Sequence, residues 1–462
     1  MRINDVIEYI DRNSEEFLAQ LIEFLRIPSV STDPKRKEDV TRAAEFTADQ
    51  LRLAGMTRVE IVATPGHPIV YGERVEDPSL PTVLVYGHYD VQPEDPVELW
   101  ESPPFEPTVR NGELFARGAA DDKGQVMIHF KSAQAYVQTQ GRLPVNMKFL
   151  IEGEEEIGSD HLDRFVKENA ELLSCDAVVI SDTTMFSRDV PSLCYGLRGL
   201  AYVQLEVRGP NRDLHSGSFG GPVDNPAQVL ARMLTSMKDQ DDRITIPGFY
   251  DKVRELTTRE REEFARLPFD AEAFKKDLGV QALAGEKGYT TLEQVWARPT
   301  LEVNGMISGF VGEGAKTVLP ALAMAKVSMR LVPDQNPKEI EDLFVDYVRR
   351  IAPQTVEVAV TPMHGGRPWV ASLDHPILQA AADAVEKGFG KRPVFQREGG
   401  SIPVVSTFTE LLKVPTVMMG IGLPDENAHA PNEKLDLGHF YKGIKSSAYF
   451  LDILAKKRDE VE

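Results

Sequence analysis

The spacing of hydrophobic residues predicts helices and buried strands in the first part of this chain. Apolar side chains between Val6 and Leu25 recur every three or four residues, as on the buried face of a helix, and Pro28 ends the pattern. A second helical pattern covers residues 38–53 and ends at Gly55. Beyond it, the pattern predicts strands at residues 59–62, 82–86 and 177–180, a buried strand at 145–151 and a helix at 125–138, and Asn111-Gly112 predicts a hairpin turn.

The pattern changes near residue 197. Apolar and polar residues alternate over 200–207, 322–331 and 355–360, as in antiparallel strands that have one face in solvent. Helical patterns at 226–238 and 337–351 lie between these strands. We therefore predict that residues 197–370 form an inserted α+β domain, in which helices cover one face of an antiparallel sheet.

After about residue 375 the first pattern returns, with a strand predicted at 414–419 and a closing helix at 438–454. We predict that residues 1–196 and 371–462 together form one α/β domain with a mostly parallel central sheet flanked by helices. The stretch 248–298 is charged and irregular, and its pattern predicts no element.

Composition narrows the class of protein and its partners. Of the 462 residues, 42% are hydrophobic, which is enough for a sizeable core, and the net charge is −20. Nucleic acids and anionic membranes bind clustered Lys and Arg, so we expect neither as a partner. Two cysteines, Cys175 and Cys194, predict no disulfide framework and no cysteine-rich zinc site. No secretory signal or membrane-spanning run is evident, and we expect a cytoplasmic protein.

Two polar residues, His88 and Asp90, follow the strand predicted at 82–86. Ligands of open α/β sheets bind beyond the carboxyl ends of the strands. A His and an Asp two residues apart can serve one metal site, the first as a ligand and the second by orienting it. The plain alternative is a His at a strand end that makes only local hydrogen bonds.

Other acidic residues, and a second His, also follow predicted strand or turn ends. Such ends gather along one edge of a parallel sheet, so we expect these groups to converge. Two His and several carboxylates suit Zn²⁺, Mn²⁺ or Co²⁺, and one carboxylate shared by two ions is typical of two-metal hydrolysis. Taken singly, Asp182 also fits a helix cap, and the acids at 154–156 also fit a solvated turn. The converging set is His88, Asp121, Glu155, Glu156, Asp182 and His429.

Seven motifs, in this order and spacing, resemble the co-catalytic-zinc aminoacylase, carboxypeptidase and dipeptidase superfamily of metallopeptidases, and in particular its carnosinase-like dipeptidase branch. Each motif alone is weak, but together they span residues 82 to 433, nearly the whole chain. They are His88-Tyr-Asp90, Arg117-Gly-Ala-Ala-Asp-Asp-Lys-Gly124, Glu152-Gly-Glu-Glu-Glu-Ile-Gly-Ser159, Ser181-Asp182, Leu214-His-Ser-Gly217, Arg397-Glu-Gly-Gly-Ser-Ile-Pro403 and Asn427-Ala-His-Ala-Pro-Asn-Glu433.

The resemblance implies two divalent metal ions per subunit, with Zn²⁺ as the expected metal and Mn²⁺ or Co²⁺ as alternatives. In relatives, the positions of His88 and Asp182 bind one ion, those of Glu156 and His429 bind the other, and that of Asp121 bridges the two. The resemblance also implies that the predicted α/β domain is the catalytic domain and that the inserted domain is a lid and dimerisation domain.

Further roles follow from the same resemblance. Asp90 is expected to orient His88, and Glu155 to act as the general base. Glu154 departs from the family pattern, which often has an apolar residue there. The peptide bond between Asp121 and Asp122 is expected to be cis, as in relatives.

Four positions resemble substrate contacts of the family. His215 matches a lid histidine that reaches the site from a partner subunit, which implies a homodimer formed through the inserted domain. Arg330 matches an arginine that grips the carboxylate of the substrate as a bidentate fork. Thr317 and Ser401 match further contacts. Taken singly, Arg330 also fits a surface strand residue, and residues 215–217 also fit a plain turn.

We therefore predict a di-metal hydrolase that cleaves dipeptides or short peptides with a free C-terminal carboxylate. The runner-up is an N-acyl amino acid amidohydrolase with the same site, because the two substrates differ only at their amino end. Two other classes are a binding protein that kept the scaffold without catalysis and a protein with one closed, structural metal ion.

Overall fold

The polypeptide leaves its first structural unit after Tyr195 and returns to it at Ala371. The computed structural model describes residues 2–400 and 402–456. Unit 1 comprises Met1–Tyr195, Ala371–Gln396 and Thr407–Glu462, and unit 2 comprises Gly196–Val370 and Arg397–Ser406.

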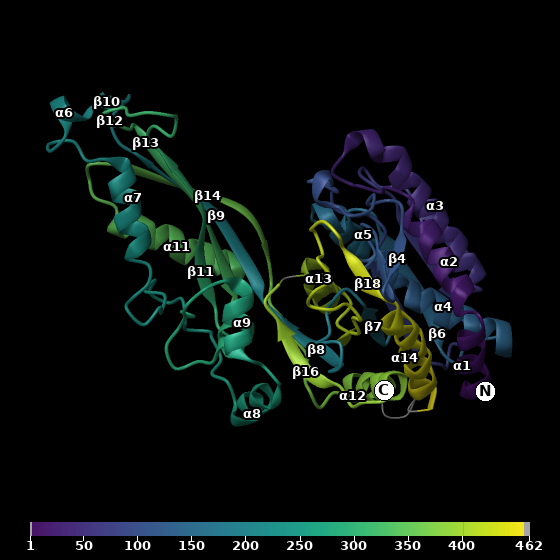
Figure 1. Ribbon diagram of the computed structural model, residues 1–462. Helices are drawn as coiled ribbons and strands as arrows, with labels where there is room; N and C mark the ends of the chain where they lie inside the picture. The colour runs from purple at the N-terminus through teal and green to yellow at the C-terminus, as the bar shows by residue number, and fades with distance from the viewer. Residues whose placement is uncertain (1, 401, 457–462) are drawn as a thin grey trace. The chain divides into compact units, whose positions relative to one another are not determined.

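The central sheet is parallel in its middle and antiparallel on both sides (Figure 1). In spatial order its strands are β1 (Arg58–Val62), β2 (Ile69–Arg74), β6 (Asn146–Glu152), β3 (Thr82–His88), β7 (Ala177–Ile180), β17 (Thr416–Met418), β8 (Ser192–Leu197) and β15 (Trp369–Val370), and β16 (Val394–Glu398) also pairs with β8. The pairs β6–β3, β3–β7 and β7–β17 are parallel. Residues that follow these strands therefore come together at one edge of the sheet.

Burial on both faces accounts for the apolar runs of these strands. Every residue of β6 and every residue of β3 after Thr82 is buried. Strands of this kind are found where helices cover both faces of a parallel sheet. The helices of unit 1 are α1 (Ile3–Arg12), α2 (Ser14–Leu25), α3 (Lys37–Leu53), α4 (Lys123–Gln140), α5 (Leu162–Glu168), α12 (Pro376–Phe389), α13 (Pro403–Leu411) and α14 (Leu437–Lys456), with short 3₁₀ turns at Pro34–Arg36, Val97–Leu99 and Glu155–Ile157. Of α13, the residues from Thr407 onward belong to unit 1.

The first predicted helix is two helices, which corrects the expectation from the sequence. α1 ends at Arg12 and is capped by Asn13, whose backbone N–H and side-chain amide both donate to the carbonyl of Tyr9, at 3.1 and 2.7 Å. α2 begins at the next residue. The apolar spacing continues across this break because both helices bury apolar residues, among them Val6, Ile10 and Phe17. Periodicity alone therefore did not reveal it.

A small antiparallel sheet in unit 1 joins two distant parts of the chain. β4 (Thr108–Arg110) and β5 (Glu113–Phe115) form a hairpin at Asn111 and Gly112, both of which have positive φ, as the sequence predicted. β18 (Lys434–Asp436) pairs with β5. This pairing places the loop before β18 beside the loop that follows β5.

The main sheet of unit 2 is antiparallel and buried on one face. Its order is β11 (Thr300–Ser308), β13 (Leu322–Leu331), β9 (Gly199–Arg208) and β14 (Glu357–Gly366). Buried and partly exposed residues alternate strictly over most of β9 and β13. The buried side chains pack with apolar residues of α7 (Pro226–Thr235) and α11 (Pro337–Ile351), such as Leu230 and Phe344. A two-stranded ribbon, β10 (Leu214–His215) with β12 (Val318–Leu319), and the short α6 (Ser216–Phe219) lie at one end of these strands (Figure 1).

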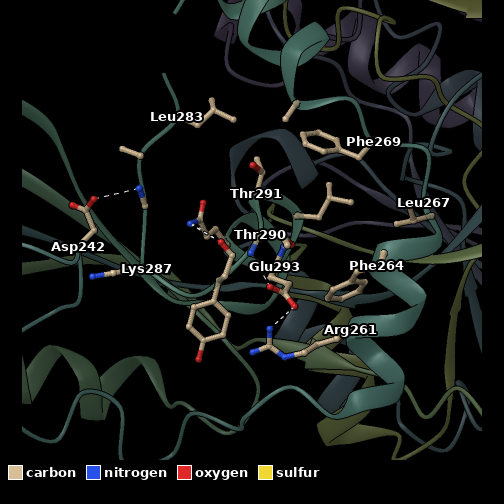
Figure 2. A pocket seen from close by; sticks show the side chains of 17 residues that line it. Asp242, Arg261, Phe264, Leu267, Phe269, Leu283, Lys287, Thr290, Thr291 and Glu293 are labelled. Atoms are coloured by element: carbon tan, nitrogen blue, oxygen red, sulfur yellow. Dashed lines mark hydrogen bonds and ion pairs between the residues drawn. The ribbon is translucent and has the colours of Figure 1, made fainter. Parts of the chain in front are cut away.

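Residues 248–298, for which the sequence predicted no element, contain three short helices: α8 (Thr258–Arg266), α9 (Ala271–Leu278) and α10 (Thr291–Ala297). Capping boxes begin α8 and α10, at Thr257 with Glu260 and at Thr290 with Glu293. These helices line a pocket of about 600 Å³, in which Arg261 and Glu293 form an ion pair of 2.9 Å (Figure 2). None of the predicted site residues that the structure describes lines this pocket.

The predicted fold class is confirmed: the protein combines a mainly parallel central sheet and helices with antiparallel sheets. Among the described residues, no helix has both the length and the apolar character that a membrane crossing would need.

Candidate metal and catalytic centre

His88 is the last residue of β3, and both it and Asp90 are buried. The Nδ1 atom of the His88 ring lies 3.1 Å from the backbone oxygen of Asp90 and 3.4 Å from its Oδ1. The ring is thereby held with Nε2 turned toward two carboxylates. This atom lies 3.1 Å from Oδ1 of Asp121 and 4.0 Å from Oδ2 of Asp182, which follows β7.

His429 approaches Asp121 from the other side. Its Nε2 lies 2.9 Å from Oδ2 of Asp121 and 3.3 Å from Oε2 of Glu156. His429 has a φ of 59°, and the same loop contains Asn427 at 57° and Asn432 at 61°. Left-handed backbone is uncommon outside glycine, tolerated best by residues such as Asn and His, and is found most often at functional sites.

Two ligand clusters share one carboxylate. His88, Asp121 and Asp182 form the first, and Asp121, Glu156 and His429 form the second, with the ligand atoms of each cluster within 4.8 Å of one another. The structure thus brings together all five residues that the sequence predicted as metal ligands.

The donor set fits divalent metal ions. The Nε2 atom of His88 is buried, and its 3.1 Å contact with Oδ1 of Asp121 lacks hydrogen-bond geometry, so it has no hydrogen-bond partner among the described residues. A buried ring nitrogen without a partner is costly, and a metal ion would satisfy it. Imidazole nitrogens combined with carboxylate oxygens are the ligands of zinc and related divalent ions.

Asp90 connects the end of β3 to the turn that carries Glu155 and Glu156. Its Oδ1 accepts the backbone N–H of Glu155 at 3.3 Å, and its Oδ2 accepts that of Glu156 at 3.2 Å. Asp90 therefore contacts His88, as expected, and also positions the backbone of both glutamates, a role that the sequence did not predict. The turn is a 3₁₀ helix, Glu155–Ile157, that follows β6.

Gln92 is a contact that the sequence reasoning missed. Its side-chain Nε2 donates to Oε2 of Glu156 at 2.7 Å, which fixes the carboxylate that also faces His429. The only signal was its place in the polar stretch directly after the strand that ends at His88. The predicted cis peptide bond between Asp121 and Asp122 is present.

Glu154, which departs from the family pattern, makes its contacts elsewhere. Its Oε2 lies 2.7 Å from Nδ1 of His161, and its Oε1 accepts the backbone N–H of His67 at 3.1 Å. Of the three consecutive acids, Glu154 is thus held by two histidine residues outside both ligand clusters, and Glu156 belongs to the second cluster. The register that makes Glu155 the base and Glu156 the ligand stays a prediction, and among these three acids it is Glu156 that lies in a ligand cluster of the described residues.

The histidines balance the negative charge of the two clusters. Burial lowers the pKa of His88, but the carboxylates of Asp121 and Asp90 outweigh it and hold this pKa well above its usual range. Contacts with Asp121 and Glu156 raise the pKa of His429 to about 10. Burial raises the pKa of Glu155 well above its usual range, although His88 opposes the shift.

Three of the predicted substrate contacts lie on described residues of unit 2. His215 is the last residue of β10 and Thr317 directly precedes β12, and the N–H of Ser216 donates to the carbonyl of Thr317 at 3.0 Å. His215 is exposed, and its Nδ1 accepts the N–H of Gly217 at 3.1 Å. Arg330, on β13, is half-buried, and burial lowers its pKa. Ser401 lies outside the described residues.

Comparison with known proteins gives consistent results. The family model described as Peptidase family M20/M25/M40 matches residues 84–452. The Cys-Gly metallodipeptidase dug1 of Schizosaccharomyces pombe is 36% identical over 98% of this chain and 99% of its own length. The crystal structure of human carnosine dipeptidase 1 has a TM-score of 0.84 at 32% identity, over 99% of both chains. An M20 family metallo-carboxypeptidase, Sso-CP2 from Sulfolobus solfataricus, has a TM-score of 0.84 at 33% identity, over 96% of this chain and 99% of that one.

The raised pKa values lead to a prediction about proton release. In ion-free protein, the raised pKa values favour the protonated forms of His88 and His429. A histidine binds a metal ion only as the neutral ring, so saturation with Zn²⁺ should release about one proton from each of them, in addition to any that Glu155 gives up. Isothermal titration calorimetry in buffers of different ionisation enthalpy measures this number.

Two variants sharpen the measurement. His429→Ala should reduce the release by about one proton. His439→Asn should leave it unchanged, since burial lowers the pKa of His439 and that ring is already neutral. Stoichiometric binding without any proton release would contradict the assignment.

Proposed function

Because this chain belongs to peptidase family M20/M25/M40, we propose that it is a metallo-dipeptidase, which hydrolyses dipeptides or short peptides that have a free C-terminal carboxylate. The resemblance drawn from the seven motifs is confirmed by the family match and by relatives at 31–36% identity over nearly the full chain. The chain is therefore an enzyme, a metallopeptidase. The observation that carries the proposal is the sharing of Asp121 between two ligand clusters.

The proposed ligand assignment follows these clusters. His88 and Asp182 hold one divalent ion, Glu156 and His429 hold the second, and Asp121 contacts both. Zn²⁺ is the proposed metal, with Mn²⁺ or Co²⁺ as alternatives, since all three accept mixed imidazole and carboxylate ligands. When bound, such ions supply Lewis acidity, which lowers the pKa of water and polarises a substrate carbonyl.

Glu155 is the proposed general base. Its backbone N–H is fixed by Asp90, next to Glu156 in the turn after β6. Its burial raises its pKa, and a base works best when its pKa lies near the working pH. The carboxylate takes a proton from the water that attacks the scissile carbonyl carbon and returns it to the leaving amine nitrogen. A single residue then serves both proton transfers.

Residues of unit 2 are proposed to hold the substrate. The half-buried guanidinium of Arg330 suits the bidentate recognition of a terminal carboxylate. Thr317 and His215, at the β10–β12 ribbon, are proposed as further contacts, together with Ser401. This assignment rests on the family motifs and on the exposure of His215.

A homodimer formed through unit 2 is also proposed. β11 is an edge strand of the sheet, and β11 and the loop after it expose apolar side chains, among them Val303, Met306, Ile307 and Phe310. Exposed apolar groups of this kind mark surfaces that a partner covers. In such a dimer, His215 of one subunit would complete the site of the other. A cytoplasmic location is part of the same proposal.

The ligand assignment predicts that Asp121→Ala and Glu155→Gln behave differently. Asp121→Ala should lose both ions, because it removes the one side chain that both clusters share. Glu155→Gln should keep both ions but lose about 10²–10⁴-fold in kcat, the usual contribution of a general base. Elemental analysis of the metal content and steady-state kinetics measure the two effects. Loss of a single ion from Asp121→Ala would contradict the shared role, and an active, metal-loaded Glu155→Gln would contradict the base.

The substrate class can be tested with a panel of compounds. A dipeptidase should cleave dipeptides such as Cys-Gly and β-Ala-His, lose activity when the C-terminal carboxylate is amidated, and leave N-acetyl amino acids intact. Amine release measured with equal amounts of each compound gives the comparison. Cleavage of the acylated set alone would make the protein an N-acyl amino acid amidohydrolase, the runner-up with the same centre.

The proposed contribution of His215 to a partner's site predicts complementation between two inactive variants. His215→Ala should lower kcat without loss of metal, and mixing it with Glu155→Gln should restore activity. After subunit exchange, mixed dimers contain one site with neither substitution, so an equal mixture should regain about one quarter of the wild-type rate. No recovery, with exchange verified by mass spectrometry, would show that His215 does not act across a dimer.

A further inference from the structure

Glu433 is a buried carboxylate for which neither the sequence motifs nor the proposed reaction has a role. Its side chain is fully buried, although it lies in the loop before β18. Its Oε2 accepts hydrogen bonds from Nη1 of Arg117 at 2.7 Å and from the N–H of Gly118 at 2.9 Å. Its Oε1 accepts the N–H groups of Ala120 at 2.9 Å and Asp121 at 3.1 Å. One carboxylate therefore binds three backbone amides and a guanidinium.

The segment that Glu433 binds has no other regular support. Residues 116–122 connect β5 to α4 and belong to neither a strand nor a helix. The N–H groups of Arg117 and Ala119 donate to the carbonyls of Pro104 and Ala116, whereas those of Gly118, Ala120 and Asp121 donate to the carboxylate of Glu433. Loss of that acceptor in a buried place would be costly. The backbone of Glu433 adds a further link, since its carbonyl accepts the N–H of Ala116 at 3.1 Å.

Arg117 completes the arrangement from the other side. It is almost fully buried, donates from Nη2 to the carbonyl of Pro93 at 3.1 Å, and lies 5.5 Å from the centre of the Trp100 ring. A charge-assisted pair between buried groups is strong when further hydrogen bonds support both partners. Here both oxygens of Glu433 and both terminal nitrogens of Arg117 are bonded, while Nε of Arg117 has no hydrogen-bond partner among the described residues. The position of the Glu433 carboxylate is thus fixed by Arg117 as well as by the three backbone amides.

The position of Glu433 in the chain links both ligand clusters. It follows His429 by four residues, so one loop carries a ligand of the second cluster and the acceptor for the backbone of Asp121. Movement of this loop would displace His429 and Asp121 together.

We propose that Glu433 is a positioning residue: together with Arg117 it fixes the backbone of Asp121, so that both carboxylate oxygens of Asp121 face the two clusters. The role rests on the proposed function of Asp121 as the ligand common to both ions. Residues that orient metal ligands without contacting the ion typically contribute 10- to 100-fold to the metal affinity.

Glu433→Gln tests the proposal with almost no change in volume. The amide keeps one acceptor oxygen and turns an NH₂ group toward groups that are themselves donors. We expect the affinity for both Zn²⁺ ions to fall about 10- to 100-fold. In the metal-free protein, we expect faster hydrogen exchange at the amides of Gly118, Ala120 and Asp121. Glu433→Asp keeps the charge and should recover part of the affinity and part of the protection.

Glu286→Gln is the matched control. Glu286 is also a buried carboxylate and accepts two hydrogen bonds of 2.7 Å from the buried Arg298, but it lies in unit 2. This variant should lower stability without changing zinc affinity or exchange at residues 116–121. If Glu286→Gln lost as much zinc affinity as Glu433→Gln, the loss would reflect general instability of the protein, and the proposal would be overturned.

The two proposals fail in different ways. Wild-type protein that takes up no divalent ion would overturn the proposed function. The positioning role alone would be overturned if the wild-type protein binds two ions and Glu433→Gln binds them with unchanged affinity. The same conclusion would follow from unchanged affinity in a folded Glu433→Asp whose amides exchange faster. Faster exchange confined to residues 116–121, together with the loss of affinity, would support it.

Discussion

Repulsion between carboxylates is the constraint on which the centre of unit 1 depends. Asp121 and Glu156 approach within reach of the same histidine, and Asp182 and Asp121 raise the pKa of Glu155 together with its burial. Away from bulk water such charges interact strongly, so the cluster is stable only when positive charge is placed among them. Protonated histidines supply that charge in ion-free protein, and divalent ions supply it otherwise. The carboxylates at this edge of the sheet therefore favour the binding of cations.

The segments that carry the ligands are positioned through their backbone amides, which donate to carboxylates outside the two clusters. Asp90 accepts the amides of Glu155 and Glu156, and Glu433 accepts those of Gly118, Ala120 and Asp121. A lysine or arginine paired directly with a ligand carboxylate would instead compete with the ions. Arg117, which lies in the same segment as Asp121, pairs with Glu433, and no ion pair joins it to a ligand carboxylate among the described residues.

The sequence predicted what depends on local pattern and order. The strand ending at His88, the hairpin at residues 111–112 and the five converging ligands all follow from short apolar runs and from motifs. The contacts of Glu154 and Glu433 join residues from seven to more than 300 positions apart, and no local pattern specifies such a partner. The helices of residues 258–297 were missed for a different reason: their capping boxes were visible in the sequence, but their charged faces give little apolar periodicity.

The division of the ligands along the chain raises the question of what the ions stabilise. Four ligands precede unit 2 and His429 follows it, so ions could in principle hold the returning segment in place. That segment, however, buries Phe440, Ile444 and Leu451 of α14 in unit 1. Each such side chain contributes roughly 1.5–3 kcal/mol on burial, which is enough to dock the helix without ions. The loop before it is different, because Ala428 and His429 are exposed and bury little apolar surface. Bound ions would therefore fix the position of His429 in this loop, while the hydrophobic core maintains the fold.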